Sequence, residues 1–308
     1  MDSEKHCPIC QSTALRKEFV GVKDLEYYSY GPVDFTRCQG CDVLFQDPLP
    51  PEELIPSFYP SNYRNYLVED KPSLLGGLKN LQASMFAKNI TKHLKNPTEN
   101  KILDLGFGNG QLLLALSRLG CKNLNGADFS EAPQHERLKQ AGIRLAFSNF
   151  DKHFPYSENE KFDCIILNNV IEHFLDPVKV LKLCKTRLSD GGKVILITPS
   201  SDALDFEIFR SAWAGFHAPR HTFIFNHRSM AELASRSGLR LSLTTAFNDP
   251  GQWAISCQSL MVDANLTNKE QLKNGLAPYT VPLSLVFGPI SIIQGLTKRS
   301  SAILSICS

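Results

Sequence analysis

The stretch KILDLGFGNG (residues 101–110) is an apolar strand that runs into a glycine-rich loop. Glycine allows backbone conformations that other residues avoid, and it lets a ligand approach the main chain closely. The dinucleotide-binding loop GxGxxG has a similar form, but it places a pyrophosphate at the start of the next helix. Here Asp104 stands at the end of the strand and would repel a pyrophosphate. The loop therefore favours a nucleoside ligand with a cationic group and no phosphate, such as S-adenosylmethionine.

A second acid stands at the end of the next predicted strand. Asp128 lies near the end of the segment LNGADF (residues 124–129), where a carboxylate can bond both hydroxyls of a ribose. A glycine loop alone is weak evidence for a ligand, because a tight turn without a ligand uses the same residues. The loop combined with an acid at the end of each of two strands is a more specific pattern. It predicts a nucleoside site at this edge of the sheet.

Short apolar strands alternate with amphipathic segments from Lys101 onward, which is typical of βαβ units on a parallel sheet. The predicted strands are residues 101–106, 124–129, 144–147, 162–168, 193–199, 239–247 and 301–307. Predicted helices include residues 111–120 and 176–189, and Gly191-Gly192 is expected to form a tight turn into the following strand. We therefore predict an α/β fold.

The first 75 residues differ from the remainder. They contain two CxxC pairs about 27 residues apart, Cys7–Cys10 and Cys38–Cys41, and little strand or helix periodicity, so they are expected to bury little apolar surface. Two such knuckles can place four thiolates around one Zn²⁺, which leaves no coordination position for a catalytic water. The alternatives are a redox-active CxxC pair and four unrelated reduced cysteines. We predict a structural zinc ribbon with its linker in residues 1–75 and one larger domain in residues 76–308.

The composition is that of an ordinary globular protein. Of the 308 residues 43% are hydrophobic, and 33 Lys and Arg against 31 Asp and Glu leave a net charge of +2. Nucleic-acid-binding domains are usually more basic, so no nucleic-acid partner is expected. The first residues lack the basic and apolar regions of a secretion signal, and nine cysteines then indicate a reducing compartment. The expected location is the cytoplasm.

In several segments the sequence resembles the class I S-adenosylmethionine-dependent methyltransferases. The matching segments, within about residues 80–245, are ILDLGFGNG, GADFS, FDCIILNNVIEHFLDP and LSDGGKVILITPS. With the CxxC pairs and the YPSNY segment (residues 59–63), the chain looks like a subgroup that carries an N-terminal zinc-binding module. Members of that subgroup modify sugars, glycan precursors or secondary metabolites. The resemblance implies a Rossmann-like sheet of seven strands whose last strand, SAILSIC (residues 301–307), inserts antiparallel beside its neighbour.

The resemblance also implies which residues bind the cofactor. The glycines of the loop would line the methionine part, and Asp128 the ribose. The loop after the third strand normally carries an acid that bonds the adenine amino group, and this chain has Asn149 in that loop. The predicted cofactor contacts are Asp104, Gly106, Phe107, Gly108, Asn109, Gly110, Asp128, Phe129, Asn149 and Asn168.

Two groups of residues are candidates for the chemistry, because methyl transfer needs an aligned acceptor and, for oxygen or carbon, a base. Glu172 and His173 follow the fourth predicted strand, at the edge of the sheet where the cofactor is expected. A second group, His217, Arg220 and His221, lies on a loop with two aromatic residues. We expect one of the three histidines to take the proton of the acceptor and Arg220 to bind an anionic group on it. The alternative for each residue is a structural role.

A hydrophobic insertion is expected near residues 258–297, of which residues 274–297 contain no charged side chain. The segment is long enough to span a bilayer, but its three prolines argue against one continuous helix. Three interpretations remain open. The insertion is a lid over the acceptor pocket, a homodimer surface, or a peripheral membrane contact that meets a lipid-linked acceptor.

These observations predict an enzyme that transfers a methyl group from S-adenosylmethionine to a small-molecule or glycan-precursor acceptor, such as a sugar, a lipid-linked saccharide or a secondary metabolite. Oxygen is the favoured acceptor atom, with carbon second. Zn²⁺ is expected as a structural ion only; no catalytic metal is expected, because Asn169 stands where a further acid would help to hold one. The alternatives are a ribosomal-RNA methyltransferase, a non-catalytic cofactor-binding subunit and, more distantly, a nicotinamide oxidoreductase.

Overall fold

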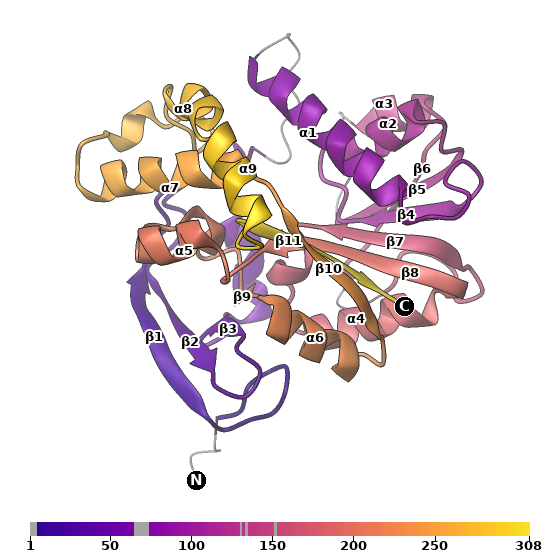
Figure 1. Cartoon of the computed structure of the whole chain (residues 1–308), viewed down its shortest axis with the longest axis horizontal. Helices are drawn as coiled ribbons and strands as arrows, with labels where there is room; N and C mark the ends of the chain where they lie inside the picture. The colour runs from indigo at the N-terminus through magenta and orange to yellow at the C-terminus, as the bar shows by residue number, and fades with distance from the viewer. Residues whose placement is uncertain (1–4, 65–73, 130, 133–134, 151–152) are drawn as a thin grey trace.

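The computed structural model describes residues 5–64, 74–129, 131–132, 135–150 and 153–308. A seven-stranded sheet with the strand order β10-β11-β8-β7-β4-β5-β6 forms its centre. A four-stranded sheet with the order β1-β2-β3-β9 lies at one end of the molecule, away from β5 and β6 (Figure 1).

The large sheet is parallel except at one strand. Its strands are β4 (Lys101–Leu105), β5 (Asn123–Asp128), β6 (Arg144–Phe147), β7 (Phe162–Asn168), β8 (Leu188–Pro199), β10 (Leu241–Phe247) and β11 (Ala302–Cys307). β11 pairs antiparallel with both β8 and β10, whereas the remaining pairs are parallel. The predicted α/β fold, with seven strands and an antiparallel last strand, is therefore confirmed.

The predicted turn at Gly191-Gly192 is wrong. β8 begins at Leu188, and both glycines belong to it. The pairing register between β7 and β8 shifts at this end, and Gly191 takes a φ of +74° there. Glycine inside a strand commonly marks such an irregularity, so the same residues indicate a bulge as readily as a turn.

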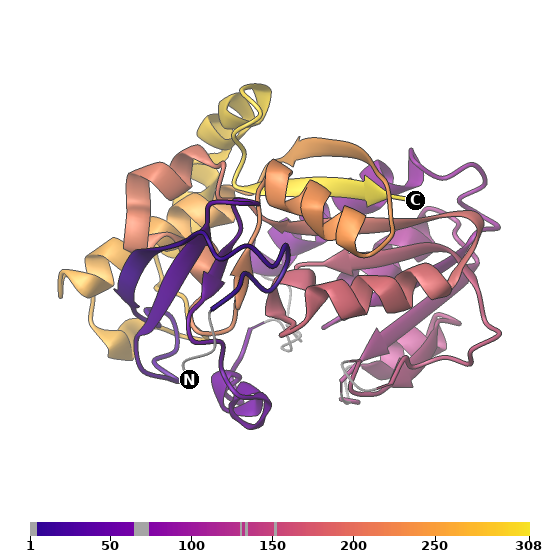
Figure 2. The ribbon, with the colours of Figure 1, turned by 90° about the horizontal axis from the view of Figure 1, so that it is seen from below.

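Helices cover both faces of the large sheet. They are α1 (Leu74–Thr91), α2 (Gln111–Arg118) and α3 (Glu136–Gln140) on one face, and α4 (Pro177–Thr186) and α6 (His227–Arg236) on the other. Figure 2 shows α4 and α6 side by side. Successive strand residues alternate between the two cores: Leu103 and Ile165 pack with α4 and α6, and Ile102 and Ile166 pack with α1 and α2. Burial on both faces explains why these strands are continuously apolar.

The N-terminal residues bury more apolar surface than the sequence suggested. They form β1 (Leu15–Val22), β2 (Val33–Cys38), β3 (Leu44–Gln46) and the 3-10 helix η1 (Glu52–Phe58). β3 pairs with β9 (Phe223–Ile224), a strand from the other half of the chain. Phe35 and Leu44 are fully buried, and they pack against Phe206 and Phe216. The expectation was wrong because the apolar partner of this segment lies far along the sequence.

Two insertions accompany the four-stranded sheet. α5 (Leu204–Phe209), η4 (Arg210–Ala212) and η5 (Ala214–Phe216) lie between β8 and β9, and α7 (Pro250–Asp263), η6 (Lys269–Gln271), α8 (Thr280–Val286) and α9 (Gly288–Leu296) lie between β10 and β11. None of the described helices is long and apolar enough to cross a membrane. The exposed apolar side chains of α8 and α9 are Leu285, Val286, Ile290, Ile292, Ile293 and Leu296. Contact of this surface with a membrane or a second copy stays a prediction.

The position of β11 between two other strands gives a test of the fold. Leu304 in β11 is fully buried, whereas Leu243 on the neighbouring β10 is 37% exposed. We expect Leu304→Ala to lower the free energy of unfolding by about 2–5 kcal/mol, because it leaves a cavity in the core. Leu243→Ala should cost about 1 kcal/mol or less. Urea unfolding followed by circular dichroism measures both, and equal losses would contradict the central position of β11.

Candidate functional site

The glycine loop joins the end of β4 to the start of α2. Gly106 and Gly110 have φ angles of +80° and +74°, conformations that residues with a Cβ atom rarely adopt. A Cβ atom on Gly106 would clash with the side chain of Val170, and one on Gly110 would clash with Leu138. Glycine is required here for two reasons, the backbone turn and the close approach of neighbouring side chains.

Two carboxylates flank this loop. Asp128 Oδ2 accepts a hydrogen bond from the backbone N–H of Gly108 at 2.7 Å, and its Oδ1 accepts one from Phe129 N–H at 2.7 Å. Asp104 is buried, and its Oδ1 has no hydrogen-bond partner among the described residues. Burial, assisted by the nearby carboxylate of Asp128, raises the pKa of Asp104 to about 8. Ribose hydroxyls and an ammonium group would satisfy this pair of acids, so the residues present fit S-adenosylmethionine.

The predicted cofactor contacts open into one cavity of about 760 Å³. Nine of the ten residues line it, and Gly110 is the exception. His173, His217 and His221 line the same cavity, whereas Glu172 and Arg220 do not. The volume lies in the upper part of the range of small-molecule sites. The structure thus brings the glycine loop, both acids and the three candidate histidines to a single space.

Several lining residues had no assigned role in the sequence. Tyr59, Tyr63 and Arg64 come from the N-terminal part, and Gln252 and Thr280 come from α7 and α8. The YPSNY segment, which contains both tyrosines, was the one signal available. The other residues belong to segments that meet only after the two insertions fold around the end of the large sheet.

The three histidines form one group, in which His217 and His221 are buried and His173 is partly buried. His173 ends the 3-10 helix η3 (Ile171–His173), which follows β7, and His217 and His221 follow η5. The ring centroid of His221 lies 4.6 Å from that of His173 and 5.1 Å from that of His217. Burial lowers the pKa of His173 to about 3 and that of His217 to about 4, and it lowers the pKa of His221 well below its usual value. All three rings are therefore neutral near pH 7, and each has one nitrogen without a proton.

His217 is oriented by a carboxylate from the N-terminal part. Its Nδ1 lies 2.6 Å from Glu26 Oε1, and its Nε2 lies 3.1 Å from the hydroxyl oxygen of Tyr63. Burial works against the charged form of Glu26, but Arg64 and His217 hold the pKa of this carboxyl well below its usual range. Nδ1–H therefore donates to the ionised Glu26, which leaves Nε2 as the proton acceptor, next to the Tyr63 hydroxyl.

Glu172 lies next to His221 but does not line the cavity. Its side chain is fully buried, and neither carboxylate oxygen has a hydrogen-bond partner among the described residues. His221 Nε2 lies 3.8 Å from Glu172 Oε1, which is beyond hydrogen-bond distance. Burial raises the pKa of Glu172 to about 8. An unsatisfied carboxyl group of this kind is rare in a protein interior.

Arg220 has a structural role in this structure. Its side chain is about 1% exposed, and its guanidinium donates to both oxygens of Asp24, at 2.9 and 3.2 Å, and to the backbone oxygen of Phe58 at 3.0 Å. The group also lies over the ring of Tyr27. These contacts do not support the expected binding of an acceptor anion by Arg220. Arg64 is an arginine that lines the cavity.

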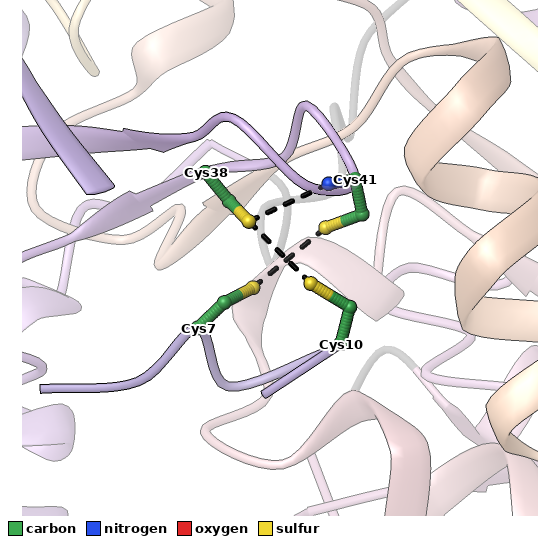
Figure 3. A group of neighbouring side chains, drawn as sticks. All are labelled: Cys7, Cys10, Cys38 and Cys41. Atoms are coloured by element: carbon green, nitrogen blue, oxygen red, sulfur yellow. Dashed lines mark hydrogen bonds between the residues drawn. The ribbon is translucent and has the colours of Figure 1, made fainter. Parts of the chain in front are cut away.

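The four cysteines of the two CxxC pairs face one another (Figure 3). Cys7 Sγ lies 3.7 Å from Cys41 Sγ, and Cys10 Sγ lies 3.4 Å from Cys38 Sγ. All four sulfur atoms lie within 4.8 Å of one another, as the ligands of one tetrahedral ion would. Helix α6 supports the group, because Arg236 donates to the backbone oxygen of Cys10 at 2.9 Å. The four thiols are separate from the cavity lining.

Comparison with known proteins indicates the family of this chain. A family model described as "Methyltransferase domain" matches residues 79–243, which is more than half of the chain. The chain is similar to the ubiquinone biosynthesis O-methyltransferase of Cereibacter sphaeroides, with 29% identity over 53% of this chain and 70% of that protein. It is also similar to the tRNA U34 carboxymethyltransferase of Campylobacter hominis, with 33% identity over 38% of this chain. That match spans only 42% of the relative's own length.

Among solved structures, the fold resembles coclaurine N-methyltransferase bound to N-methylheliamine and SAH. The TM-score is 0.50 and the identity 16%, and the match covers 84% of this chain and 79% of that one. A likeness at this identity supports the fold alone. The family model matches more than half of the chain, and the glycine loop and the paired acids open into one cavity. The chain therefore belongs to the methyltransferase domain family and is an S-adenosylmethionine-dependent methyltransferase.

Proposed function

We propose that this enzyme methylates a hydroxyl oxygen on a small-molecule or glycan-precursor acceptor, such as a sugar, a lipid-linked saccharide or a secondary metabolite. One observation carries the proposal: a carboxylate-oriented histidine, His217, opens into the same cavity as the cofactor residues. A hydroxyl acceptor must lose a proton during transfer, and a neutral imidazole can take it. The likeness to ubiquinone biosynthesis O-methyltransferases supports oxygen as the acceptor atom.

At the cofactor end, backbone and carboxylate groups do the binding. Two backbone N–H groups hold Asp128 in place, and its remaining lone pairs would accept hydrogen bonds from the ribose hydroxyls. Asp104 faces the cavity beside the glycine loop and is suited to an ammonium group. Phe129 and Asn149 also line this end, where the adenine would lie. The cofactor supplies an activated methyl group, and these residues fix its direction.

At the acceptor end, we assign the proton acceptor role to His217 Nε2. Glu26 fixes the ring by accepting from Nδ1–H, as the acid does in a hydrolase triad. The Tyr63 hydroxyl beside Nε2 can pass the proton from an acceptor that does not reach the ring itself. The ring of His173, in contrast, directs its Nδ1 toward the backbone oxygen of Arg220. His217 is thus the histidine with the clearest arrangement for a base.

Asp128 gives the first test of the cofactor end. Asp128→Ala should weaken the binding of S-adenosylhomocysteine by about 1–3 kcal/mol, the range for a lost hydrogen bond to a charged group. Isothermal titration calorimetry measures the change. Asp190→Ala is the control, because Asp190 is exposed and lies outside the cavity lining. Binding of NADH in place of S-adenosylhomocysteine by the unmodified protein would overturn the assignment of the site.

His217 gives the test of the acceptor end. We expect His217→Gln to lower kcat by about 10²–10⁴-fold, the usual contribution of a general base, with the affinity for S-adenosylhomocysteine unchanged. Transfer of a labelled methyl group to a panel of catechols, sugar nucleotides and lipid-linked saccharides provides the rate. His227→Gln is the matched control, since His227 lies partly exposed beside Asp202. Full turnover by His217→Gln would exclude this base.

We further propose that Cys7, Cys10, Cys38 and Cys41 hold a structural Zn²⁺. The four cysteines belong to the same hydrophobic core as Leu103 on β4, so the metal would hold the N-terminal part against the large sheet. Four thiolates complete a tetrahedral site and leave no open position for catalysis. The ion would add its binding free energy to the stability of the fold.

Loss of this zinc should destabilise the whole chain. The unmodified protein should keep its zinc during dialysis against EDTA, and the Cys38→Ser variant should lose it. The variant should also have a thermal midpoint lower by about 5–10 °C. Cys257→Ser is the control, because Cys257 is an isolated, half-buried thiol in α7. Mass spectrometry of bound metal and a thermal melt provide the two readings. Undiminished zinc in Cys38→Ser would show that the ion binds elsewhere.

A further inference from the structure

We propose that Glu172, His173 and His221 form a second metal site, at the acceptor end of the cavity, for a divalent transition-metal ion that binds the acceptor oxygen. This site lies apart from the four cysteines. It rests on the proposed function, because it names the group that would make an acceptor hydroxyl acidic. The proposal also revises the expectation of no catalytic metal. That expectation was based on Asn169, and the sequence did not show that His221 lies beside Glu172 and His173.

The first observation is the state of Glu172. Its side chain is fully buried, and both oxygens lack a hydrogen-bond partner among the described residues. The Thr198 hydroxyl lies near this carboxyl group and favours its charged form, but it has no partner within hydrogen-bond distance among the described residues. Burying a carboxyl group without compensation is costly, and a bound ion is one of the accepted explanations for such a group in a native structure. A divalent cation would compensate it, and the group would then be ionised.

The second observation is the orientation of the two imidazole rings. His173 Nδ1 lies 3.0 Å from the backbone oxygen of Arg220, and His221 Nδ1 lies 2.7 Å from that of Gly215. A carbonyl oxygen only accepts, so each Nδ1 must carry the proton and each Nε2 keeps a lone pair. The hydroxyl oxygen of Tyr59 lies 3.0 Å from His173 Nδ1 and adds to this arrangement. Metal-binding histidines are held in this way by a hydrogen bond from the other nitrogen.

The third observation is how close the three residues are. One ligand atom from each of Glu172, His173 and His221 lies within 4.8 Å of the others. The two segments are tied together by the backbone, since Thr222 N–H donates to the backbone oxygen of Glu172 at 2.8 Å. The Thr222 hydroxyl donates to the same oxygen at 3.0 Å. The ligand set is therefore fixed by the fold and does not depend on the rotation of exposed side chains.

The types of ligand limit which ions the site can bind and which acceptors it can take. Two imidazole nitrogens and one carboxylate suit Zn²⁺, Mn²⁺, Fe²⁺ or Co²⁺. Three protein ligands would leave positions open on a bound ion, and because His173 and His221 line the cavity, an acceptor in the cavity could reach them. An ion there lowers the pKa of a hydroxyl that binds it. The acceptor class that fits best has two adjacent oxygens, as in a catechol or a vicinal diol.

The atoms and electrons of the methyl transfer balance with His217, Tyr63, the acceptor and the cofactor. The proton of the acceptor hydroxyl passes to His217 Nε2, either directly or through Tyr63. The oxygen then forms a bond to the methyl carbon, and the carbon–sulfur bond breaks with its electron pair left on sulfur. The sulfonium becomes a neutral thioether, so no oxidant or reductant is needed.

Manganese binding to the zinc-loaded, full-length protein tests the site, because Mn²⁺ prefers nitrogen and oxygen ligands over thiolates. Titration followed by electron paramagnetic resonance should show one bound Mn²⁺ in the unmodified protein. Glu172→Gln and His221→Asn should each weaken this binding at least tenfold. His227→Asn, outside the site, should bind Mn²⁺ as the unmodified protein does. The proposal would be overturned if the unmodified protein bound no Mn²⁺, or if both site variants bound Mn²⁺ as tightly as the unmodified protein does.

A second measurement needs no variant. Pulsed electron paramagnetic resonance of Mn²⁺ bound to the unmodified protein should show nuclear modulation from two imidazole nitrogens, and the absence of nitrogen coupling would overturn the site. Methyl transfer distinguishes this proposal from the proposed function. Transfer that continues after EDTA removes all but the cysteine-bound zinc would reject the metal and keep the hydroxyl methyltransferase. Mn²⁺ binding at these ligands without transfer to any hydroxyl acceptor would keep the metal site and reject that function.

Discussion

The buried ion pair between Asp24 and Arg220 holds together the two segments that form the acceptor end of the cavity. Both side chains are almost completely buried, and Asp24 also accepts hydrogen bonds from the backbone N–H groups of Tyr27 and Ser29. The loop around Asp24 is thereby fixed, and Glu26 meets His217 as a consequence. Removing one partner of such a pair commonly costs about 3–5 kcal/mol, because the other charge is left buried and unpaired. The N-terminal part is therefore a component of the site and not an appendage to it.

The two ends of the cavity shift the pKa values of their ionisable groups in opposite directions, and burial is the largest cause of both shifts. Removing an ionisable group from water disfavours its charged form, which raises the pKa of acids and lowers that of histidines. Asp104 at one end and His173 at the other shift in these opposite directions. One end thus favours a cationic ligand, which restores the charge of the acids, and the other keeps imidazoles free to accept a proton or bind an ion. The groups proposed for both requirements of methyl transfer line a single cavity.

Local sequence patterns were informative for features whose interacting residues are close together in the chain. The glycine loop, Asp128 and the CxxC pairs could be recognised because turn geometry and ligand spacing are properties of a few neighbouring residues. The alternation of strands and helices gave the seven-stranded sheet. Gly191-Gly192 was misjudged because a turn and a bulge require the same residues. Arg220 was misjudged because its charge partner, Asp24, lies almost two hundred residues earlier in the chain.

The sequence by itself predicted the cofactor residues, because the glycine loop is local and because each of the two acids stands at the end of a strand of one parallel pair. Only the tertiary structure decided the acceptor end. Glu26, Tyr63 and His217 meet because β3 pairs with β9, and Glu172 meets His221 because Thr222 binds its backbone oxygen. These contacts depend on long-range pairing and on burial, and neither leaves a pattern in neighbouring residues.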